Sequence, residues 1–225
     1  VSRVGRDTTQ RVNAFSDLVA DIKQGEARIL VGTQMLAKGH DFHDVTLVGV
    51  LDTDQGLYSA DFRATENLAQ MITQVTGRAG RGAKEGEVLI QSEQPQHPFW
   101  RDLIREGYAL TADKLLQERL EMGMPPASHW AVIRAEASDR SLAMDFLGEV
   151  AGMMAHSSQQ AVMVMGPVPA IMEKKGGRYR AQLLLNSAER KPLHQILDQH
   201  TDTISRHKLA RKLRWSIDID PMDLV

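Results

Sequence analysis

Two short glycine-containing stretches say most about this chain, and the later one reads Gln74-Val75-Thr76-Gly77-Arg78-Ala79-Gly80-Arg81. It follows an apolar run with helical spacing, so both of its arginines stand on a turn that glycine loosens. Arginine is permanently charged, and its planar fork of N–H donors matches phosphate oxygens. The stretch therefore indicates phosphate chemistry, in which an arginine finger contributes about 10³–10⁵ in rate. The alternative is an ordinary helix end whose arginines pair with carboxylates or face solvent.

The earlier stretch reads Ile29-Leu30-Val31-Gly32-Thr33-Gln34-Met35-Leu36-Ala37-Lys38-Gly39-His40-Asp41-Phe42. A buried strand is predicted to end at Gly32, which puts Thr33 and Gln34 at the carboxyl edge of a sheet, where open α/β sheets bind ligands. The Thr33 hydroxyl and nearby N–H groups suit a nucleic-acid phosphate, and Asp41 suits a ribose hydroxyl. Taken alone, the stretch also fits a strand–turn–helix loop with a capping aspartate. The order of the two stretches within α/β elements favours the functional interpretation.

Composition bounds the remaining possibilities. The 225 residues leave room for one large domain or two small ones, and 42% hydrophobic and 25% charged residues are an ordinary globular mixture. A net charge of −2 means that any nucleic-acid surface must be local. The chain has no cysteine, so it forms no disulfide or thiolate metal site of its own. Apolar runs such as Val45–Leu51 are far too short to span a bilayer. Because the chain begins directly on a strand-like Val1–Val4, we expect it to be a fragment of a longer protein.

The first part of the chain, residues 1–94, is predicted to be an α/β unit with a parallel sheet. Strands are predicted at Val1–Val4, Arg28–Val31, Val45–Leu51 and Glu87–Gln91, helices at Gln10–Gln24 and Arg63–Val75, and a polar loop at Asp52–Phe62.

A helical linker follows at residues 95–127, with a helix or helical pair from Phe99 to Met122 that Pro125-Pro126 ends. In residues 128–225 the order of predicted strands and helices changes. This order predicts an α+β sandwich of ferredoxin-like type. Its strands are predicted at His129–Ala137, Val162–Met165, Ile171–Lys174, Tyr179–Leu185 and Leu213–Ile219, and its helices at Ser141–His156 and Glu189–His207. The pair Gly176-Gly177 is a hairpin signal between two of these strands.

Basic residues gather at this predicted hairpin, where Lys174, Lys175, Arg178 and Arg180 surround Tyr179. Charge with an interleaved aromatic ring suits single-stranded or branched nucleic acid. Alternation puts Arg178, Arg180 and Gln182 on one face of the strand. The alternative is a solvated hairpin that blunts an edge strand. A second basic run, Arg206, Lys208, Arg211, Lys212 and Arg214, is either a phosphate contact or a solvated helix end favoured by the helix dipole.

The two glycine-containing stretches resemble motifs V and VI of superfamily 2 helicases. Their residues are similar to those of the same motifs in the PriA family of bacterial replication-restart helicases. The resemblance runs nearly end to end and includes Arg6-Asp7-Thr8-Thr9, Leu51-Asp52-Thr53-Asp54, Ser59-Ala60-Asp61-Phe62-Arg63 and Gly166-Pro167-Val168-Pro169-Ala170. It implies that residues 1–94 are the later part of a RecA-like lobe 2 with motifs IV–VI, and that residues 128–225 are the family's C-terminal domain. His43 departs from the family, which has proline there.

The resemblance also implies roles for single residues. Catalysis is expected from Arg81 as the arginine finger, with Arg78 beside it and Gln74 coupling nucleotide to DNA. The nucleotide site would comprise Gly39, Asp41, Gly77, Arg78 and Arg81. DNA would be held by Thr33, Gln34, Lys38, Lys174, Lys175 and Arg180, and the acidic tail of single-stranded DNA-binding protein by Arg178 and Gln182. No residue of this chain is expected to bind metal.

By the same resemblance, the parent protein is an ATP-dependent 3′-to-5′ DNA helicase that recognises stalled or branched forks and starts primosome assembly. Its partners would be branched and single-stranded DNA, single-stranded DNA-binding protein and other primosome proteins, in the bacterial cytoplasm at the nucleoid and without a membrane. ATP and Mg²⁺ would be shared with lobe 1, and the family's zinc ions need cysteines that this chain lacks.

The chain has neither a Gly-x-x-x-x-Gly-Lys-Ser/Thr loop nor an Asp-Glu-x-His motif, so alone it is expected to hydrolyse no ATP. One alternative is a non-catalytic module that binds fork DNA and single-stranded DNA-binding protein. Another is a RecG-like helicase or restriction translocase, which the block from Gly166 to Gln182 argues against.

Overall fold

The computed structural model describes residues 2–4, 29–32, 45–77, 79, 86–157 and 161–224. It forms two compact units. Unit 1 comprises Val1–Leu57 and Glu66–Ala109, and unit 2 comprises Tyr58–Thr65 and Leu110–Val225. Residues 95–109 of the expected linker thus fall in unit 1, and residues 110–127 and 58–65 fall in unit 2.

Unit 1 contains two parallel strand pairs, as expected of an α/β unit. Strand β1 (Ser2–Val4) pairs with β2 (Leu30–Gly32), and β3 (Leu47–Val50) pairs with β4 (Glu87–Ile90). The predicted helix Gln10–Gln24 lies outside the described residues.

The prediction of a polar loop at Asp52–Phe62 is wrong in part, because a short helix, α2 (Asp54–Leu57), forms within it. Two side chains tie its start to the end of β4. The Thr53 hydroxyl donates to the Gln91 carbonyl at 2.6 Å, and the Asp54 carboxylate accepts from the Ser92 hydroxyl at 2.7 Å. These contacts join residues far apart in the sequence, so local sequence patterns did not indicate them.

Helix α3 (Ala64–Thr76) confirms the prediction from apolar spacing. Its buried side chains are Leu68, Ala69 and Ile72, which share one face of the helix. Helix α2 packs closely on it, since a Cβ atom added at Gly56 would stand 3.0 Å from the Leu68 Cβ.

Helix α4 (Pro98–Glu121) consists of two helical segments joined at a kink. Gly107 adopts φ 82°, a left-handed conformation that glycine permits at no steric cost. The predicted helical pair is thus confirmed, and the kink lies next to the division between the two units.

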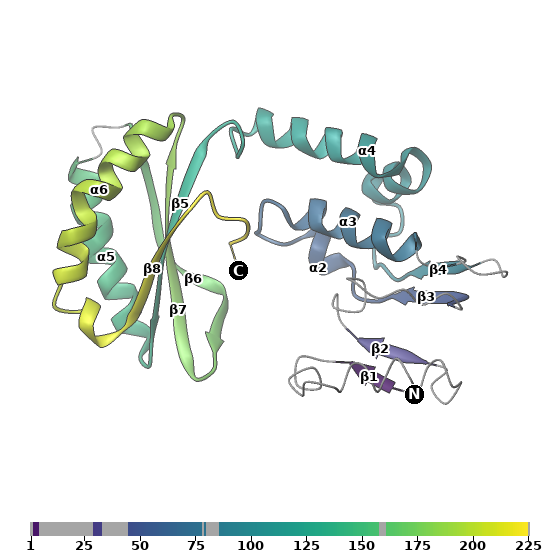
Figure 1. The fold of residues 1–225 in the computed structure, drawn as a ribbon, viewed down its shortest axis with the longest axis horizontal. Helices are drawn as coiled ribbons and strands as arrows, with labels where there is room; N and C mark the ends of the chain where they lie inside the picture. The colour runs from purple at the N-terminus through teal and green to yellow at the C-terminus, as the bar shows by residue number, and fades with distance from the viewer. Residues whose placement is uncertain are drawn as a thin grey trace. The chain divides into compact units, whose positions relative to one another are not determined.

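Unit 2 has the order β5 (His129–Ala137), α5 (Arg140–Ser157), β6 (Met163–Lys175), β7 (Arg178–Ser187), α6 (Arg190–Arg206), η2 (Ala210–Lys212) and β8 (Arg214–Ile219). The sheet is antiparallel with strand order β6-β7-β5-β8, which confirms the ferredoxin-like prediction. Helices α5 and α6 lie together on one face, and the segment after β8 turns toward the other (Figure 1). We call that second face the outer face.

The core of unit 2 lies between the sheet and the two helices. It includes the fully buried side chains of Ile133, Leu183, Phe146 and Leu193, one from each of β5, β7, α5 and α6. On β7 every second residue from Ala181 to Ser187 is buried, so the residues between them lie on the outer face.

Strand β6 is continuous, whereas two strands were predicted. Its pairing with β7 shifts register between Met165 and Val168 and again between Pro169 and Lys174. An edge strand tolerates proline and such irregularities, so the glycine and prolines of this region bend the strand without ending it. Gly166 is required there: it has φ 104°, and a Cβ atom would stand 3.2 Å from the Gln182 carbonyl oxygen.

The hairpin between β6 and β7 is confirmed as a two-residue turn. Gly176 and Gly177 have φ values of 57° and 78°, the pattern of a type I′ turn. The turn brings Lys175 opposite Arg178.

Candidate nucleic-acid and partner interface

The carboxyl end of α3 carries the described part of the later glycine-containing stretch. Gln74 and Gly77 are both exposed there. The Gly77 N–H donates to the Thr73 carbonyl at 3.0 Å, and the Ala79 N–H donates to the Val75 carbonyl at 3.4 Å, so helical hydrogen bonding continues past Thr76. The other predicted site residues of this stretch, Arg78 and Arg81, lie outside the described residues.

The earlier stretch is described only up to Gly32. Its strand is confirmed, since β2 pairs with β1 in parallel. The predicted site residues beyond the strand lie outside the described residues: Thr33, Gln34, Lys38, Gly39 and Asp41.

The β6–β7 hairpin brings its basic side chains into different environments. The Lys174 ammonium lies 3.4 Å from the Tyr179 hydroxyl and 4.8 Å from the centre of that ring, a cation–π arrangement. Lys175 is exposed at the turn, and Arg178 beside it is half-buried. The like charges of Lys175 and Arg178 stand opposite each other, so an anion at the hairpin would relieve their repulsion.

Arg180 is already compensated within the sheet. Its Nε lies 3.2 Å from the Glu136 Oε1, across the β7–β5 ladder, and only 12% of its side chain is exposed. The sequence analysis grouped Arg180 with Lys174 and Lys175 as DNA-binding cations, because the strand register that pairs Arg180 with Glu136 could not be read from the sequence.

Gln182 lies in the same row of the sheet as Arg134 and Val168. The Arg134 guanidinium donates to the Asp218 carboxylate at 2.7 Å and to the Asp223 carbonyl at 2.9 Å. The outer face thus carries a line of polar side chains next to the predicted partner-binding residues.

Sequence reasoning missed Arg134 and Glu136. The signal was present, because these two charged residues alternate with apolar ones along His129–Ala137. Alternation of this kind marks the solvent-facing side of a strand.

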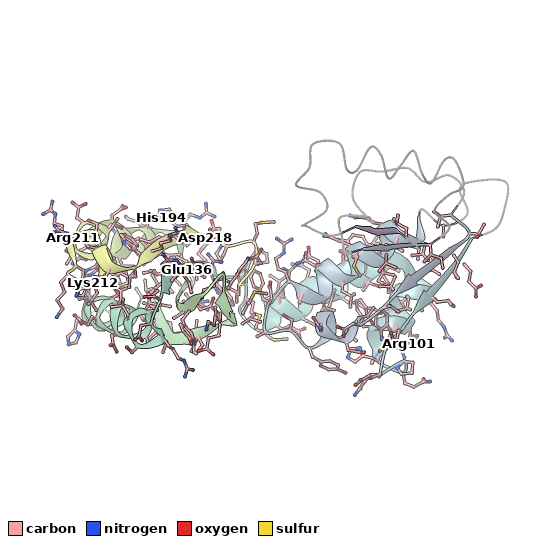
Figure 2. All side chains as sticks on the ribbon, turned by 90° about the horizontal axis from the view of Figure 1, so that it is seen from below. Arg101, Glu136, His194, Arg211, Lys212 and Asp218 are labelled. Carbon is pink, nitrogen blue, oxygen red and sulfur yellow. The ribbon has the colours of Figure 1, made fainter. Side chains whose placement is uncertain are left out.

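The second basic run leads into β8, whose first residues pair with the end of β5. Its members are exposed: Arg206, Lys208, Arg211, Lys212 and Arg214. Arg214 stands opposite Glu136 across the β8–β5 ladder, and Glu136 stands opposite Arg180 on the other side. Figure 2 shows Arg211 and Lys212 close together on unit 2. Both basic runs therefore lie at the end of the sheet where β5 finishes and β7 and β8 begin.

Within the part of the chain that the structure describes, no three His, Cys, Asp or Glu side chains gather as a metal site. The described helices include none with the length and apolar character needed to cross a membrane.

Comparison with known proteins gives two family matches. Residues 5–83 match the helicase conserved C-terminal domain, and residues 120–222 match the family described as primosomal protein N C-terminal domain. These two matches cover most of both units.

Individual relatives match along almost the whole chain. A Haemophilus influenzae protein named replication restart protein PriA is 42% identical over 224 residues, which is 100% of this chain and 30% of that protein. A Bacillus subtilis protein of the same name is 32% identical over 221 residues, 98% of this chain and 28% of that protein. The chain thus spans less than a third of the length of either relative. Among solved structures, a de novo designed protein, Foldit4, covers 42% of this chain at 10% identity with a TM-score of 0.33, which is too low to support an inference.

Proposed function

Because the chain belongs to the PriA family, we propose that it forms the lobe-2 and C-terminal part of an ATP-dependent 3′-to-5′ DNA helicase. The full-length protein would recognise stalled or branched replication forks and start primosome assembly, in the bacterial cytoplasm at the nucleoid. One observation carries the proposal: a helicase match over residues 5–83 is followed in the same chain by a family-specific match over residues 120–222.

ATP would bind between this lobe and a first lobe that the chain does not contain. The proposed reaction is transfer of the γ-phosphoryl group to water. Arg81 would donate to the γ-phosphate oxygens as charge spreads over them, with Arg78 as a second cation near the phosphates. Mg²⁺ held by the first lobe would neutralise the same charge. Gln74, exposed at the end of α3, would link the nucleotide to DNA.

The nucleotide sugar and the backbone around it would lie against Gly39, Asp41 and Gly77. Glycine suits close approach because it has no side chain. The described part of this set agrees with that use, since Gly77 is exposed at the end of α3. Zinc, which the family also uses, would be bound by other parts of the full-length protein.

DNA would contact Thr33, Gln34 and Lys38 on lobe 2, and the basic hairpin on unit 2. At the hairpin, Lys175 is exposed, and Lys174 is held over the Tyr179 ring. Arg180 belongs to this set with a smaller role, because a phosphate would have to displace the Glu136 carboxylate from it.

The acidic tail of single-stranded DNA-binding protein would bind to Arg178 and Gln182. The support is their place on β7, where both lie on the outer face beside exposed cations. Gln182 is uncharged, so Gln182→Ala is expected to weaken binding of a tail peptide while leaving the salt dependence of DNA binding unchanged. Equal losses for peptide and DNA would contradict a separate tail site.

The ATPase rate of the full-length protein on branched DNA, with and without Arg81→Ala, tests the motor proposal. We expect a fall of about 10²-fold or more with DNA binding retained. Equal rates would mean that Arg81 is structural. The chain alone is expected to hydrolyse no ATP.

The alternative is a non-catalytic module that binds fork DNA and single-stranded DNA-binding protein. It is favoured by the cations that gather on the β6–β7 hairpin of a chain whose net charge is −2. An intact first lobe in the full-length sequence separates the two proposals, because only a motor requires it.

A further inference from the structure

Five exposed cations follow one another where α6 ends and β8 begins. They lie on the last residue of α6, in the turn after it, on η2 and on the first residue of β8. None of them belongs to the nucleotide, DNA or tail sites proposed above. We call this group the η2 patch: Arg206, Lys208, Arg211, Lys212 and Arg214.

Backbone hydrogen bonds fix the turn that carries the η2 patch. The His207 N–H donates to the Ile204 carbonyl at 3.1 Å and closes α6. The Ala210 N–H then donates to the His207 carbonyl at 3.0 Å. The Lys212 N–H donates to the Leu209 carbonyl at 2.9 Å. The chain therefore passes from α6 to β8 along a defined path.

The apolar side chains of this turn belong to the core of unit 2. Ala210 is 7% exposed, and Leu209 and Leu213 pack against the same core. The cations of the turn are exposed, and Arg211 and Lys212 lie close together (Figure 2). The fold thus presents these charges as a fixed group on the surface.

The His207 ring anchors the turn to α5. Its Nδ1 accepts from the Leu209 N–H at 3.3 Å, which leaves the ring proton on Nε2. Nε2 lies 2.8 Å from the Glu149 Oε2, and the ring centroid lies 5.8 Å from that of Phe146. The Glu149 carboxylate is thus engaged by His207 and not by a cation of the η2 patch.

The η2 patch differs from other basic positions of unit 2 because its charges are not compensated. Elsewhere in the unit four arginines form ion pairs: Arg134 with Asp218, Arg140 with Glu173, Arg180 with Glu136 and Arg190 with Asp220. Within the residues that the structure describes, no side chain of the η2 patch forms an ion pair or a hydrogen bond. Since like charges held near one another repel, an anion bound there would relieve their repulsion.

The helix dipole accounts for only part of the η2 patch. It favours cations at the end of a helix, and the effect falls off within the last turn. Arg206 lies in that turn. Arg211 and Lys212 lie beyond it on η2, and Arg214 lies on β8. The dipole therefore does not explain why the later cations gather here.

The surroundings of the η2 patch fit the phosphates of duplex DNA. Residues 206–214, all of which the structure describes, expose no large apolar side chain that could anchor a protein partner. They also contain no Phe, Tyr or Trp on which the bases of a single strand could stack. What remains is fixed positive charge, which binds phosphates without reading bases. The β6–β7 hairpin differs, because Tyr179 stands among its cations.

We propose that the η2 patch binds the phosphate backbone of the duplex part of a fork, while the β6–β7 hairpin binds a single strand. One fork can occupy both surfaces because they are close. Arg180 of β7 and Arg214 of β8 both stand opposite Glu136 of β5, so their Cα atoms are roughly 10 Å apart. This inference rests on the proposed DNA-binding function.

Substitutions of exposed cations test the η2 patch without disturbing the core. Arg211→Ala combined with Lys212→Ala removes two charges that make no side-chain contact within the described residues, so the unfolding midpoint of unit 2 is expected to stay the same. Lys212→Ala alone has a matched control in Lys191→Ala. Lys191 is exposed in the first turn of α6, roughly 20 Å along the helix from its last residue.

The measurement is the salt dependence with which the full-length protein binds a blunt duplex and a single strand of equal length. Each lost phosphate contact lowers the slope of log K against log salt by about 0.9 for duplex DNA. We expect Lys212→Ala to lower the duplex slope by that amount and the double substitution by about 1.8, with the single-strand slope unchanged. Lys175→Ala, on the hairpin, is expected to lower the single-strand slope, and Lys191→Ala neither slope.

An unchanged duplex slope in the double variant would overturn the inference, and so would equal losses for duplex and single strand. A labelled polyglutamate peptide serves as the probe for an acidic protein partner. If the double variant loses binding to this peptide and keeps its duplex slope, the patch binds acidic protein and the inference fails.

The same measurements separate the inference from the proposed function. If Lys175→Ala lowers the single-strand slope while the η2 variants behave like the unsubstituted protein, the inference fails and the proposed function stands. If the unsubstituted full-length protein binds neither DNA, the proposed function fails and the inference with it.

Discussion

Lys175 and Arg180 stand on the same hairpin, and we expect opposite consequences from removing them. Arg180→Ala breaks an ion pair in which 12% of one side chain and 35% of the other are exposed. Exposed pairs contribute about 0–1 kcal/mol, and breaking a buried one costs about 3–5 kcal/mol. The partial burial here places the expected loss of unit 2 stability at about 1–2 kcal/mol. Lys175→Ala is expected to change stability by less than about 0.5 kcal/mol, because Lys175 is exposed.

For the salt dependence of DNA binding, we expect Lys175→Ala to have the larger effect and Arg180→Ala the smaller one. Losing one phosphate contact lowers the slope of log K against log salt by about 0.7 for single-stranded DNA. Lys175→Ala is expected to lower the slope by that amount. Arg180→Ala weakens binding mainly because it leaves the Glu136 carboxylate uncompensated near the phosphates, so adding Glu136→Gln is expected to restore affinity. Glu136→Gln is not expected to rescue Lys175→Ala.

Urea unfolding and fluorescence anisotropy measure these two effects. Trp100 lies in unit 1, so a Trp100→Phe background lets the remaining tryptophans, Trp130 and Trp215, report on unit 2. Anisotropy of a labelled single strand at several salt concentrations gives the slope. The reasoning is refuted if Arg180→Ala leaves the unfolding midpoint unchanged and lowers the salt slope as much as Lys175→Ala does.

Three further predictions concern the fold that supports these sites. Leu183→Ala, in the fully buried core, is expected to destabilise unit 2 by about 2–5 kcal/mol in the same unfolding assay. Gly166→Ala is expected to cost about 1–3 kcal/mol because φ 104° is strained for alanine, and Gly148→Ala in α5, where a Cβ atom meets nothing within 4 Å, is its control. Hydrogen bonds from the Glu93 N–H and then from the Ser92 hydroxyl lower the pKa of Asp54. Asp54 therefore stabilises unit 1 above the unfolded-state pKa of about 3.9, and this is lost as pH falls through the lowered folded-state value. Asp54→Asn should flatten the loss of unit 1 stability at acidic pH, as followed by Trp100 fluorescence, and an unchanged acid profile would contradict this.

Patterns that depend on local spacing were predicted from the sequence. Helix α3 and the alternation along β7 follow from apolar periodicity, and the hairpin turn follows from two adjacent glycines. The ferredoxin-like order of unit 2 was predicted in its sequence of helices and strands, although one strand too many was expected. Strand β6 was divided because its glycine and prolines usually end a strand, and an edge position lets it continue.

Features that depend on distant contacts were not predicted. The docking of Tyr58–Thr65 on unit 2 rests on contacts such as Asp61 to Leu224, which are separated by 163 positions. The pairing of Arg180 with Glu136 depends on strand register, which the sequence leaves open. Similar residues in one basic run therefore have different environments, and only some of them are free to bind an anion.

The central claim is that this chain is part of a DNA motor, and strand separation tests it most directly. The measurement is unwinding of a forked DNA by the full-length protein with ATP, compared with Arg81→Lys. Lysine keeps the charge but not the planar fork of donors, so we expect Arg81→Lys to abolish unwinding and retain DNA binding. Unwinding that survives Arg81→Lys unchanged, or a full-length protein that binds the fork and never separates it, would contradict the account.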